Sequence, residues 1–369
     1  MKHIVIVITT GVAEYGGLTT VMMNYLNHMN LAGLTISFVS CNEIDDSMRA
    51  RFEKLGIEYY CLPSRKKKPF LYYRELVRVL KDTHCDLIHV NGNSATMIIE
   101  MRAAERAGVR QRISHCHASQ SNHAVINTIM HPVFNSSYSK AIAVSEEAGK
   151  WAYGNREFTV LKNAIETERF AFNKEVRKQY RKALGIQDRI VIGTIGKLNP
   201  PKNHAFLLRI MKELSADDSR YVFLLVGEGE ERRNLEEYIK NNSLQDHVIM
   251  LGGRKDNAEL LQAMDLFVFP SQYEGFGMAL LEAEISGLPC ICSENIPEIT
   301  RICESVKAAP FDEKIWKKML VDASVELGRT DRTERSKKAL QCSEREGLNI
   351  KKEASSLRVI YESMLEGEG

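Results

Sequence analysis

Two glutamates stand eight positions apart around a Gly-Phe-Gly turn in the segment FPSQYEGFGMALLEAEISGLP, residues 269–289. Glu274 precedes the turn, and Glu282 follows it inside a helix that we expect to begin near Met278. A carboxylate accepts hydrogen bonds from two hydroxyl groups, so it suits a ribose diol or a sugar ring. An acidic side chain early in a helix also stabilises the helix dipole, which is a structural explanation for Glu282 alone. Because that explanation omits Glu274 and the glycines, we interpret the segment as a binding site for a polyhydroxylated ligand.

A second candidate segment, GTIGKLNPPKNHAFLL (residues 193–208), leads from a predicted strand through a Pro-Pro turn into a predicted helix. It contains Lys197 and Lys202, and Lys202 stands where the helix is expected to begin. A cation at this position opposes the helix dipole by about 0.3–1 kcal/mol. An anion bound between the two lysines and the helix N–H groups would reverse this balance, and a diphosphate fits. The alternative is a pair of solvated surface lysines.

Two glycine-rich loops also follow predicted strands, but neither completes a nucleotide-binding motif. The loop TTGVAEYGGLTT contains Gly16 and Gly17 and lacks the lysine and the Ser/Thr of an NTPase phosphate loop. VGEGEERR contains Gly227 and Gly229, but Arg232 replaces the third glycine of a dinucleotide fingerprint. The Gly16-Gly17 pair still precedes a predicted helix, whose first N–H groups can bind an anion. A plain turn is the alternative for this loop.

Strand and helix signals alternate along the chain, which is typical of parallel sheets covered by helices on both faces. The alternation starts at IVIVI (Ile4–Ile8) and restarts at RIVIGTIG (residues 189–196). Because 369 residues exceed the usual size of one hydrophobic core, we expect two α/β domains, at residues 1–165 and 166–345. Apolar residues in the segment 346–369 recur every three or four positions. This spacing predicts an amphipathic helix, which we expect to pack back on the first domain.

The composition excludes several classes of function. A formal net charge of +2 gives no sign of a nucleic-acid-binding protein. The eight cysteines include no C-x-x-C pair, which predicts buried free thiols in a reducing cytosol and no zinc site. The apolar run in MKHIVIVITTG is too short for a signal peptide, and no run reaches the roughly 18 residues of a membrane span. We therefore expect a cytoplasmic protein that holds no metal.

The motif EGFGMALLEA, with its two glutamates eight positions apart, resembles the signature of the retaining glycosyltransferases of family 4 (glycosyltransferase group 1). The Gly16-Gly17 loop, GKLNPPKN, VGEGEERRNL and the turn LKNAI are similar to further segments of that family. RISHCHAS is similar to a strand-end histidine segment in bacterial exopolysaccharide and capsule members. The resemblance covers nearly the whole chain. It implies the α/β fold called GT-B, with two Rossmann-like parallel-sheet domains facing a central cleft.

The resemblance also implies roles for the matching residues. The donor-binding residues would be Gly16, Gly17, Lys197, Gly275, Phe276, Gly277 and Glu282. Lys202 would neutralise the diphosphate leaving group, Glu274 would hold the donor sugar, and His117 would line the reacting sugar. His115 would lie on the acceptor side, although the sequence does not decide which histidine faces the ligand. The family usually has arginine at the position of Lys197, and lysine keeps the charge without the planar bidentate geometry.

The implied function is transfer of a hexose or N-acetylhexosamine from a nucleotide sugar, most often a UDP-sugar in this family. The acceptor would be a glycan or a polyprenyl-linked sugar of surface polysaccharide biosynthesis. No cofactor is expected, and no metal, because lysines can balance the diphosphate charge. Two alternatives remain. One is a sugar-nucleotide epimerase of the same architecture, which needs no acceptor, and the other is a non-catalytic subunit that binds a nucleotide sugar.

The segment SRKKKPFLYY, residues 64–73, places four consecutive basic residues before an aromatic cluster. Such a segment suits an anionic membrane surface that carries a lipid-linked acceptor, with each charge contributing about 1 kcal/mol. This interpretation predicts a protein bound peripherally to the inner face of a membrane. The alternative is a solvated loop before a helix whose aromatic side chains pack inward.

Overall fold

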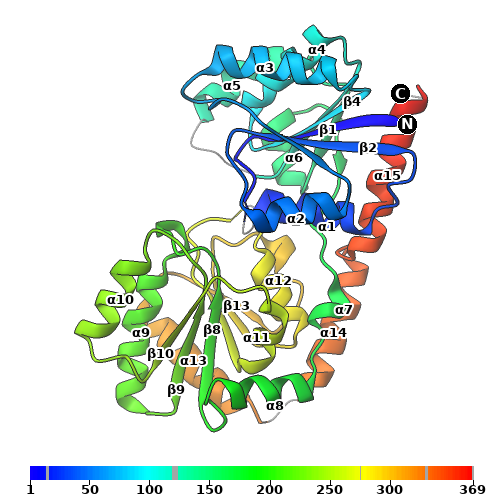
Figure 1. The fold of residues 1–369 in the computed structure, drawn as a ribbon. Helices are drawn as coiled ribbons and strands as arrows, with labels where there is room; N and C mark the ends of the chain where they lie inside the picture. Colours follow the sequence, from blue (N-terminus) through cyan, green and yellow to red (C-terminus); the bar gives the residue numbers. More distant parts are fainter. Residues whose placement is uncertain (14–15, 119–123, 275, 329–330, 368–369) are drawn as a thin grey trace. The chain divides into compact units, whose positions relative to one another are not determined.

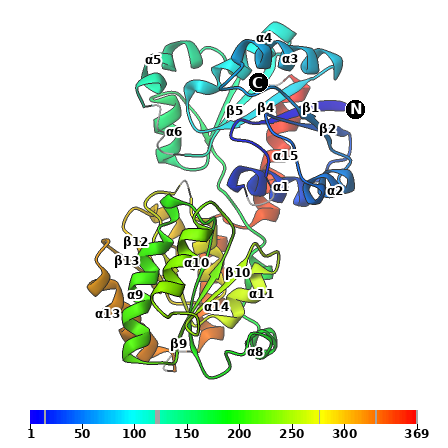
Figure 2. The same cartoon turned by 60° about the vertical axis from the view of Figure 1, so that its left-hand side comes forward.

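The computed structural model describes residues 1–13, 16–118, 124–274, 276–328 and 331–367. The chain divides into two compact units, which we call unit 1 (Met1–Ile165 with Asn349–Gly369) and unit 2 (Glu166–Leu348). Each unit is built around one parallel sheet with helices on both faces (Figures 1 and 2). This architecture confirms the predicted α/β fold with two Rossmann-like domains.

The described residues of unit 1 form a seven-stranded parallel sheet in the order β3-β2-β1-β4-β5-β6-β7. The strands are β1 (Lys2–Ile8), β2 (Leu34–Ser40), β3 (Glu58–Cys61), β4 (Leu87–Gly92), β5 (Gln111–Cys116), β6 (Lys140–Ala143) and β7 (Thr159–Val160). The helices are α1 (Gly17–His28), α2 (Asp46–Lys54), α3 (Pro69–Asp82), η1 (Ala95–Met97), α4 (Ile98–Ala107), α5 (Ala124–Phe134), α6 (Glu146–Tyr153) and α15 (Ile350–Glu366). The strand order reverses between β1 and β4, which makes this pair the switch point of the sheet.

Strand β1 shows why the sequence IVIVI has no polar position. Ile4, Ile6 and Ile8 pack in the cluster that α1, α2 and α15 complete. Val5 and Val7 pack on the opposite face, in the cluster with residues of α3, α4, α5 and α6. A central strand of a parallel sheet is buried on both faces, so a continuous apolar run is required.

Helix α15 belongs to unit 1, although it follows unit 2 in the chain. Its apolar stripe is buried and consists of Ile350, Ala354, Leu357, Tyr361 and Met364. These side chains share a core cluster with α1 and β1, and the main-chain N–H of Ile350 donates to the oxygen of Ile165 at 3.1 Å. The last helix is therefore part of the unit in which the chain began.

The described residues of unit 2 form a six-stranded parallel sheet in the order β10-β9-β8-β11-β12-β13. The strands are β8 (Ile190–Ile195), β9 (Tyr221–Val226), β10 (Val248–Gly252), β11 (Leu266–Phe269), β12 (Cys290–Ser293) and β13 (Val306–Ala309). The helices are α7 (Thr167–Phe170), α8 (Lys174–Ala183), η2 (Pro200–Lys202), α9 (His204–Asp217), α10 (Arg232–Asn241), α11 (Asn257–Ala263), α12 (Met278–Ile285), η3 (Glu298–Thr300), α13 (Glu313–Glu326) and α14 (Arg332–Arg345). The switch point of this sheet lies between β8 and β11.

The core of unit 2 is centred on Trp316, whose side chain is fully buried. Its ring meets that of Phe206 edge to face, with centroids 5.3 Å apart. Helices α9, α10 and α13 supply this side of the sheet, while α8, α11, α12 and α14 lie on the other (Figure 1). The apolar strands of unit 2 are thus also covered on both faces.

The expectation that the cysteines are buried was wrong for most of them. All eight are free thiols, and only Cys116, Cys290 and Cys292 are buried. Cys61 is exposed because it ends β3, which is an edge strand of the unit 1 sheet.

Sequence analysis did not predict strand β13. This strand has only four residues, lies at the edge of the unit 2 sheet and contains the exposed Lys307.

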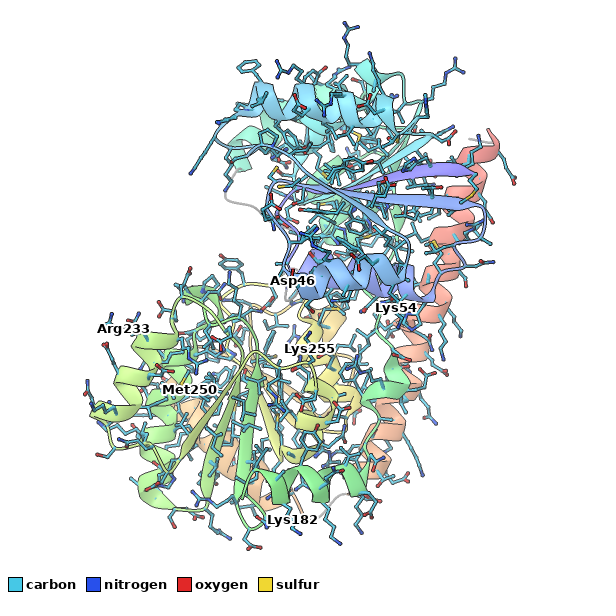
Figure 3. All side chains as sticks on the ribbon, in the orientation of Figure 1. Asp46, Lys54, Lys182, Arg233, Met250 and Lys255 are labelled. Atoms are coloured by element: carbon cyan, nitrogen blue, oxygen red, sulfur yellow. The ribbon has the colours of Figure 1, made fainter. Side chains whose placement is uncertain are left out.

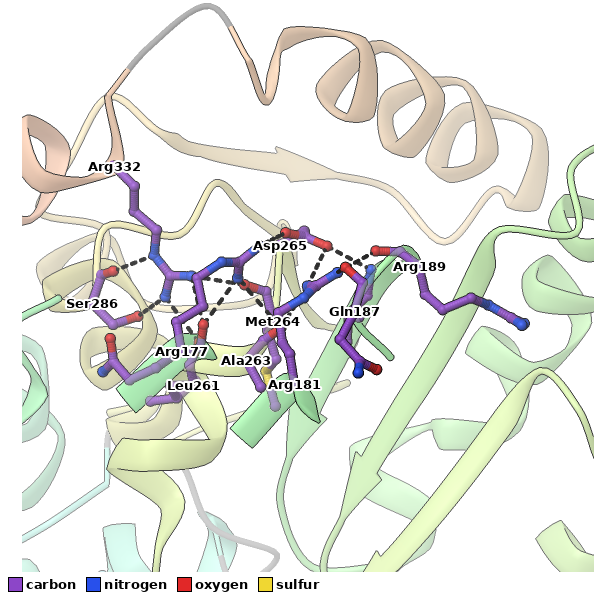
Figure 4. A network of polar contacts seen from close by, with 12 residues as sticks. Arg177, Arg181, Gln187, Arg189, Leu261, Ala263, Met264, Asp265, Ser286 and Arg332 are labelled. Atoms are coloured by element: carbon purple, nitrogen blue, oxygen red, sulfur yellow. Dashed lines mark hydrogen bonds and ion pairs between the residues drawn. The ribbon is translucent and has the colours of Figure 1, made fainter. Parts of the chain in front are cut away.

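A partly buried arginine, Arg332, joins two helix ends in unit 2 (Figure 4). The guanidinium of Arg332 donates to the main-chain oxygens of Leu261 (2.9 Å), Gln262 (3.1 Å), Met264 (2.7 Å) and Ser286 (2.8 Å). These oxygens lie at the C-terminal ends of α11 and α12, where carbonyl groups lack partners within the helix. Burial, together with the nearby charge of Arg177, lowers the pKa of Arg332. A cation at helix C-termini also interacts favourably with their dipoles.

Asp265 balances part of this positive charge. Its carboxylate forms ion pairs with Arg177 and with Arg181, the latter at 3.0 Å (Figure 4). The same carboxylate accepts the main-chain N–H of Val191 in β8 at 2.8 Å. The network therefore fixes the start of β11 beside β8, so it positions the two strands of the switch point.

We expect Arg332→Met to lower the free energy of unfolding of unit 2 by about 2–4 kcal/mol, because it removes the guanidinium donors of four buried carbonyl groups, two of which (Gln262 and Met264) still bind Arg177. Urea unfolding should be followed by the fluorescence of Trp316 in a W151F background, since Trp151 belongs to unit 1. The control is Arg233→Met on α10, where the side chain is 88% exposed (Figure 3) and should matter little. Equal unfolding midpoints for the two variants would contradict a stabilising role for Arg332.

Candidate functional site

The candidate residues lie at the switch points of the two sheets. In unit 1, the Gly16-Gly17 loop follows β1, and the neighbouring strands β4 and β5 end at Gly92 and Cys116. In unit 2, Lys197 and Lys202 follow β8, and Glu274 follows β11. Ligands of open α/β sheets bind beyond the carboxyl ends of strands at such reversals. Each unit therefore carries its candidate residues where its own topology favours a ligand, and we describe the two sites separately.

The basic loop of unit 2 runs from β8 into α9 through the short helix η2. Lys197 is exposed, and Lys202 ends η2 two residues before α9 begins. Asn203 links the two helices in a left-handed conformation with φ 54°. The sequence predicted that Lys202 would begin the helix, and the η2 turn instead places it just outside. His204 is buried, and burial together with the charge of Lys202 lowers its pKa to about 4.

The glycines of VGEGE support this basic loop by close backbone packing. A Cβ atom on Gly227 would stand 1.9 Å from the oxygen of Gly196, and one on Gly229 would stand 2.2 Å from the oxygen of Leu198. The N–H of Leu198 also donates to the oxygen of Glu228 at 2.9 Å. The two loops are therefore in main-chain contact, which only glycine permits at these positions. This contact explains the glycine pattern that fails as a dinucleotide motif.

The structure describes two residues of the Gly-Phe-Gly turn, Phe276 and Gly277. Gly275 lies outside the described residues. Phe276 is buried, and its main-chain oxygen accepts the hydroxyl of Thr300. Gly277 has φ 91°, a left-handed conformation that favours glycine, and it precedes α12 directly. The turn therefore ends in a backbone conformation that sets the start of α12.

Glu274 and Lys202 form a pair in the structure, although sequence analysis assigned them separate roles. The Lys202 Nζ and the Glu274 carboxylate form an ion pair, and their side chains are 23% and 13% exposed. Lys202 Nζ also lies 5.0 Å from the centroid of the Phe269 ring. The main-chain N–H of Gln272 donates to the oxygen of Pro201 at 2.8 Å, which ties the two loops together. The segments 197–202 and 269–277 thus form one site.

Glu282 occupies the second turn of α12 and is partly exposed. Burial raises the pKa of its carboxyl group to about 7, although the positive charge of Arg169 on α7 opposes this shift. Sequence analysis missed Arg169, which no motif marked. Glu284 is buried, and burial raises its pKa to about 8 while its Oε2 accepts the N–H of Cys303 at 2.9 Å. Glu284 therefore has a structural role, because its carboxylate binds the main chain at Cys303.

Three helix starts adjoin the candidate loops without a side-chain cap among the described residues. They are α1 at Gly17, α9 at His204 and α12 at Met278. Gly16 precedes α1 with a partly exposed backbone, and Gly17 is exposed. The first N–H groups of an uncapped helix lack partners within the helix, so they remain able to bind an anion.

A buried hydrogen-bonded chain reaches the strand ends of unit 1 from α15. The Tyr361 hydroxyl lies 2.7 Å from His89 Nδ1, and His89 Nε2 lies 3.2 Å from His115 Nδ1. All three side chains are fully buried. Burial lowers the pKa of His89 to about 3 and that of His115 well below its ordinary value, with neighbouring histidines adding to both shifts. His115 is therefore a neutral, internal member of this chain.

His117 follows β5 directly and packs against His115, with ring centroids 4.0 Å apart and the ring planes tilted by 35°. Asn91 Nδ2 donates to the main-chain oxygen of His89 at 3.4 Å, so Asn91 Oδ1 is oriented to accept a hydrogen bond from His117 Nε2 at 2.9 Å. Burial lowers the pKa of His117 to about 3, although the neighbouring Asn163 side chain opposes this shift, so the ring is neutral. Nδ1 of His117 and Oδ1 of Asn163 are buried and find no hydrogen-bond partner among the described residues. A hydroxyl group could donate to either atom.

Sequence analysis missed three members of this cluster: His89, Asn91 and Tyr361. The first two occupy alternate positions of HVNG, as do the histidines of SHCH. This spacing places all four side chains on one face of two neighbouring strands. The sequence therefore contained a pattern that predicts the cluster. Tyr361 was predicted only as an apolar position of the last helix.

The basic segment after β3 is divided between interior and surface. Arg65 forms an ion pair at 2.6 Å with the fully buried Glu100. The lysines at positions 66–68 are exposed, and Phe70 is 90% exposed at the start of α3. Tyr72 is buried. The exposed basic group therefore has three members rather than four, and the aromatic cluster is only partly available.

In the parts of the chain that the structure describes, no three His, Cys, Asp or Glu side chains are grouped so that they could hold a metal ion. No helix within those parts combines the length and the apolar character that crossing a membrane requires.

Both units match known protein families. Residues 15–169 match the family described as Glycosyltransferase Family 4, and residues 176–320 match Glycosyl transferases group 1. The putative glycosyltransferase EpsF of Bacillus subtilis (strain 168) is 29% identical over 297 residues, which cover 77% of each chain. The UDP-Gal:alpha-D-GlcNAc-diphosphoundecaprenol alpha-1,3-galactosyltransferase of Escherichia coli is 28% identical over 280 residues, or 68% of this chain and 67% of that one.

A solved structure shares the fold. The crystal structure of Anabaena HepE in complex with UDP and glucose superposes with a TM-score of 0.78 at 17% identity, covering 97% of this chain and 99% of that one. Two glycosyltransferase family models thus account for most of the chain, and the protein is a glycosyltransferase with the GT-B fold.

Proposed function

We propose that this protein is a retaining glycosyltransferase that moves a sugar from a UDP-sugar to a glycan or lipid-linked acceptor in surface polysaccharide biosynthesis. The observation that carries the proposal is the contact between the basic loop and the two-glutamate segment at the switch point of unit 2. One site then offers cations for a diphosphate and carboxylates for sugar hydroxyls. Few ligands other than a nucleotide sugar need both.

On the donor side, Glu282 accepts hydrogen bonds from the ribose hydroxyls, and Lys202 and Lys197 neutralise the diphosphate. Glu274 and the 275–277 turn hold the donor sugar. The uncapped start of α9 adds N–H groups beside the diphosphate. Preorganised charges of this kind are usually the largest electrostatic contribution to catalysis, because they act where negative charge grows on the leaving group.

From unit 1, His117 contacts the reacting sugar through Nδ1. The lowered pKa makes His117 a hydrogen-bond acceptor rather than a base, so it orients a hydroxyl without removing its proton. His115 supports it through the tilted contact between their rings and lies on the acceptor side. The Gly16-Gly17 start of α1 admits the ligand close to the backbone of unit 1.

The reaction breaks the bond between the anomeric carbon and the diphosphate oxygen, and it forms a bond from that carbon to the acceptor oxygen on the same face. The leaving phosphate takes the proton of the acceptor hydroxyl. The transition state resembles an oxocarbenium ion, so no carboxylate nucleophile is needed. Lys202 and Lys197 take the role that a metal ion plays elsewhere.

The names of the relatives indicate which donor and acceptor to propose. HepE was solved with UDP and glucose, and the Escherichia coli relative is named for UDP-Gal and a diphosphoundecaprenol-linked acceptor. A UDP-hexose or UDP-N-acetylhexosamine donor and a lipid-linked acceptor are therefore the substrates that we propose. We also propose that the protein works in the cytoplasm at the inner face of a membrane.

Isothermal calorimetry with UDP, UDP-glucose, UDP-galactose, UDP-N-acetylglucosamine, GDP-mannose, NAD and ATP tests the donor. We expect wild-type protein to bind one UDP-sugar and Glu282→Ala to lose most of that affinity, because the ribose contacts are gone. Binding of NAD or ATP alone would contradict the proposal. Turnover of the bound UDP-sugar without any acceptor would favour an epimerase, and binding without transfer to any acceptor would favour a non-catalytic subunit.

Donor affinity should depend on pH through Glu282. Its pKa is raised to about 7, so the carboxylate is present above that pH and becomes protonated as the pH falls through it. Because the charged form accepts both ribose hydroxyls, we expect affinity for the bound UDP-sugar to fall below about pH 7. Glu282→Gln should bind more weakly and with little pH dependence. An unchanged pH profile in this variant would remove Glu282 from the donor site.

The exposed basic group at residues 66–68, with Phe70, should bind anionic lipid by charge attraction and insertion of the ring. We expect co-sedimentation with phosphatidylglycerol vesicles at low salt and none with phosphatidylcholine. K66Q/K67Q/K68Q/F70S should abolish it. The matched control K174Q/K178Q/K182Q removes three exposed lysines from α8 and should still bind. Equal losses in both variants would mean that only net charge matters.

A further inference from the structure

We propose that the Lys202–Glu274 ion pair makes unit 2 discriminate a nucleotide sugar from a bare nucleoside diphosphate. The inference rests on the proposed function and gives Glu274 a second role, as a specificity-determining residue. In the structure, the group that we assign to the diphosphate and the group that we assign to the sugar neutralise each other.

Hydrogen bonds hold together the two loops that carry the pair. The N–H of Gln272 donates to the oxygen of Pro201 at 2.8 Å, and Asn295 Nδ2 donates to the oxygen of Gln272 at 2.8 Å. The loops that carry the two charges are thus joined to each other and to the segment after β12. Phe269 lies beneath the ammonium group, with 5.0 Å between Nζ and the ring centroid.

A diphosphate must compete with Glu274 for this lysine. Once Lys202 turns to a phosphate oxygen, the Glu274 carboxylate loses its counter-ion and stands close to further negative charge. Its side chain is only 13% exposed, so water replaces the lost partner incompletely. Lys197 is exposed and can also approach a phosphate, but it does not restore the partner of Glu274.

The sugar of a nucleotide sugar removes this penalty. Its hydroxyl groups are donors, and a carboxylate released from Lys202 accepts them. A bare diphosphate offers no such donors, so Glu274 stays uncompensated and draws Lys202 back. The pair should therefore weaken UDP more than a UDP-sugar and favour release of UDP after transfer.

A double-mutant cycle tests the competition with UDP as the probe. Calorimetry gives the Kd of UDP for wild type, E274Q, K202M and K202M/E274Q. We expect E274Q to tighten UDP by about fivefold or more, because glutamine leaves Lys202 free for the diphosphate. In the K202M background the same substitution removes only the direct repulsion between Glu274 and the diphosphate. The resulting gain in UDP affinity should therefore be at least about threefold smaller. The ratio of the Kd of UDP to that of the best-binding UDP-sugar should fall in E274Q.

Each other outcome contradicts the inference. Weaker UDP binding by E274Q would make Glu274 a contact of the nucleotide. An equal gain with and without Lys202 would reduce the effect to repulsion between charges. If wild-type protein binds neither UDP nor any UDP-sugar, the proposed function fails together with the inference, whereas UDP binding with an additive cycle contradicts the inference alone.

The matched control is E237Q on α10, which breaks the exposed ion pair with Arg233 (2.9 Å) and makes the same change of charge. It should leave UDP affinity unchanged. Melting curves of all variants show whether the fold is kept. If E274Q does not fold, E274A replaces it with the same expectation, because alanine also leaves Lys202 without its carboxylate.

Discussion

Parallel pairing of β1 with β4, and of β8 with β11, is the constraint on which both candidate sites depend. In a parallel sheet every strand ends at the same edge, and helices must cross over the faces to connect them. Loops that are far apart in sequence therefore meet beyond one edge. The pair of strands where the order reverses leaves the neighbouring crossovers on opposite faces, which opens space for a ligand. The networks around Asp265 and Arg332 keep that pairing in place in unit 2.

Close main-chain packing then shapes the charged site. Gly227 and Gly229 let one loop pack directly against the backbone of the basic loop, which supports that loop. Gly277 ends the other loop in a left-handed conformation and starts α12. The result is a pair of supported loops that carry opposite charges into contact. Separating this partly buried ion pair costs little free energy only when a ligand offers a new partner to each charge.

The two units carry different chemistry. Unit 1 presents histidines that burial keeps neutral, together with asparagine side chains, and these suit hydroxyl groups. Unit 2 presents lysines and carboxylates, which suit a diphosphate and the diols of ribose and sugar. Tyr361 links the histidines to α15, so the last helix of the chain fixes the orientation of side chains at the strand ends of unit 1. This division is consistent with donor and acceptor functions on separate domains.

The sequence by itself determined the alternation of strands and helices, the two α/β units, and the segments around Lys202, Glu274 and Glu282. These follow from local properties, since hydrophobic period, glycine and proline turns, and short motifs are written in neighbouring residues. Only the tertiary structure decided that Lys202 and Glu274 are partners, that the charge of Arg169 acts on Glu282, and that Tyr361 contacts His89. Those interactions join residues separated by 72, 113 and 272 positions, and no local pattern encodes which side chains a sheet edge will bring together. The burial that lowers the histidine pKa values likewise depends on the whole packed unit.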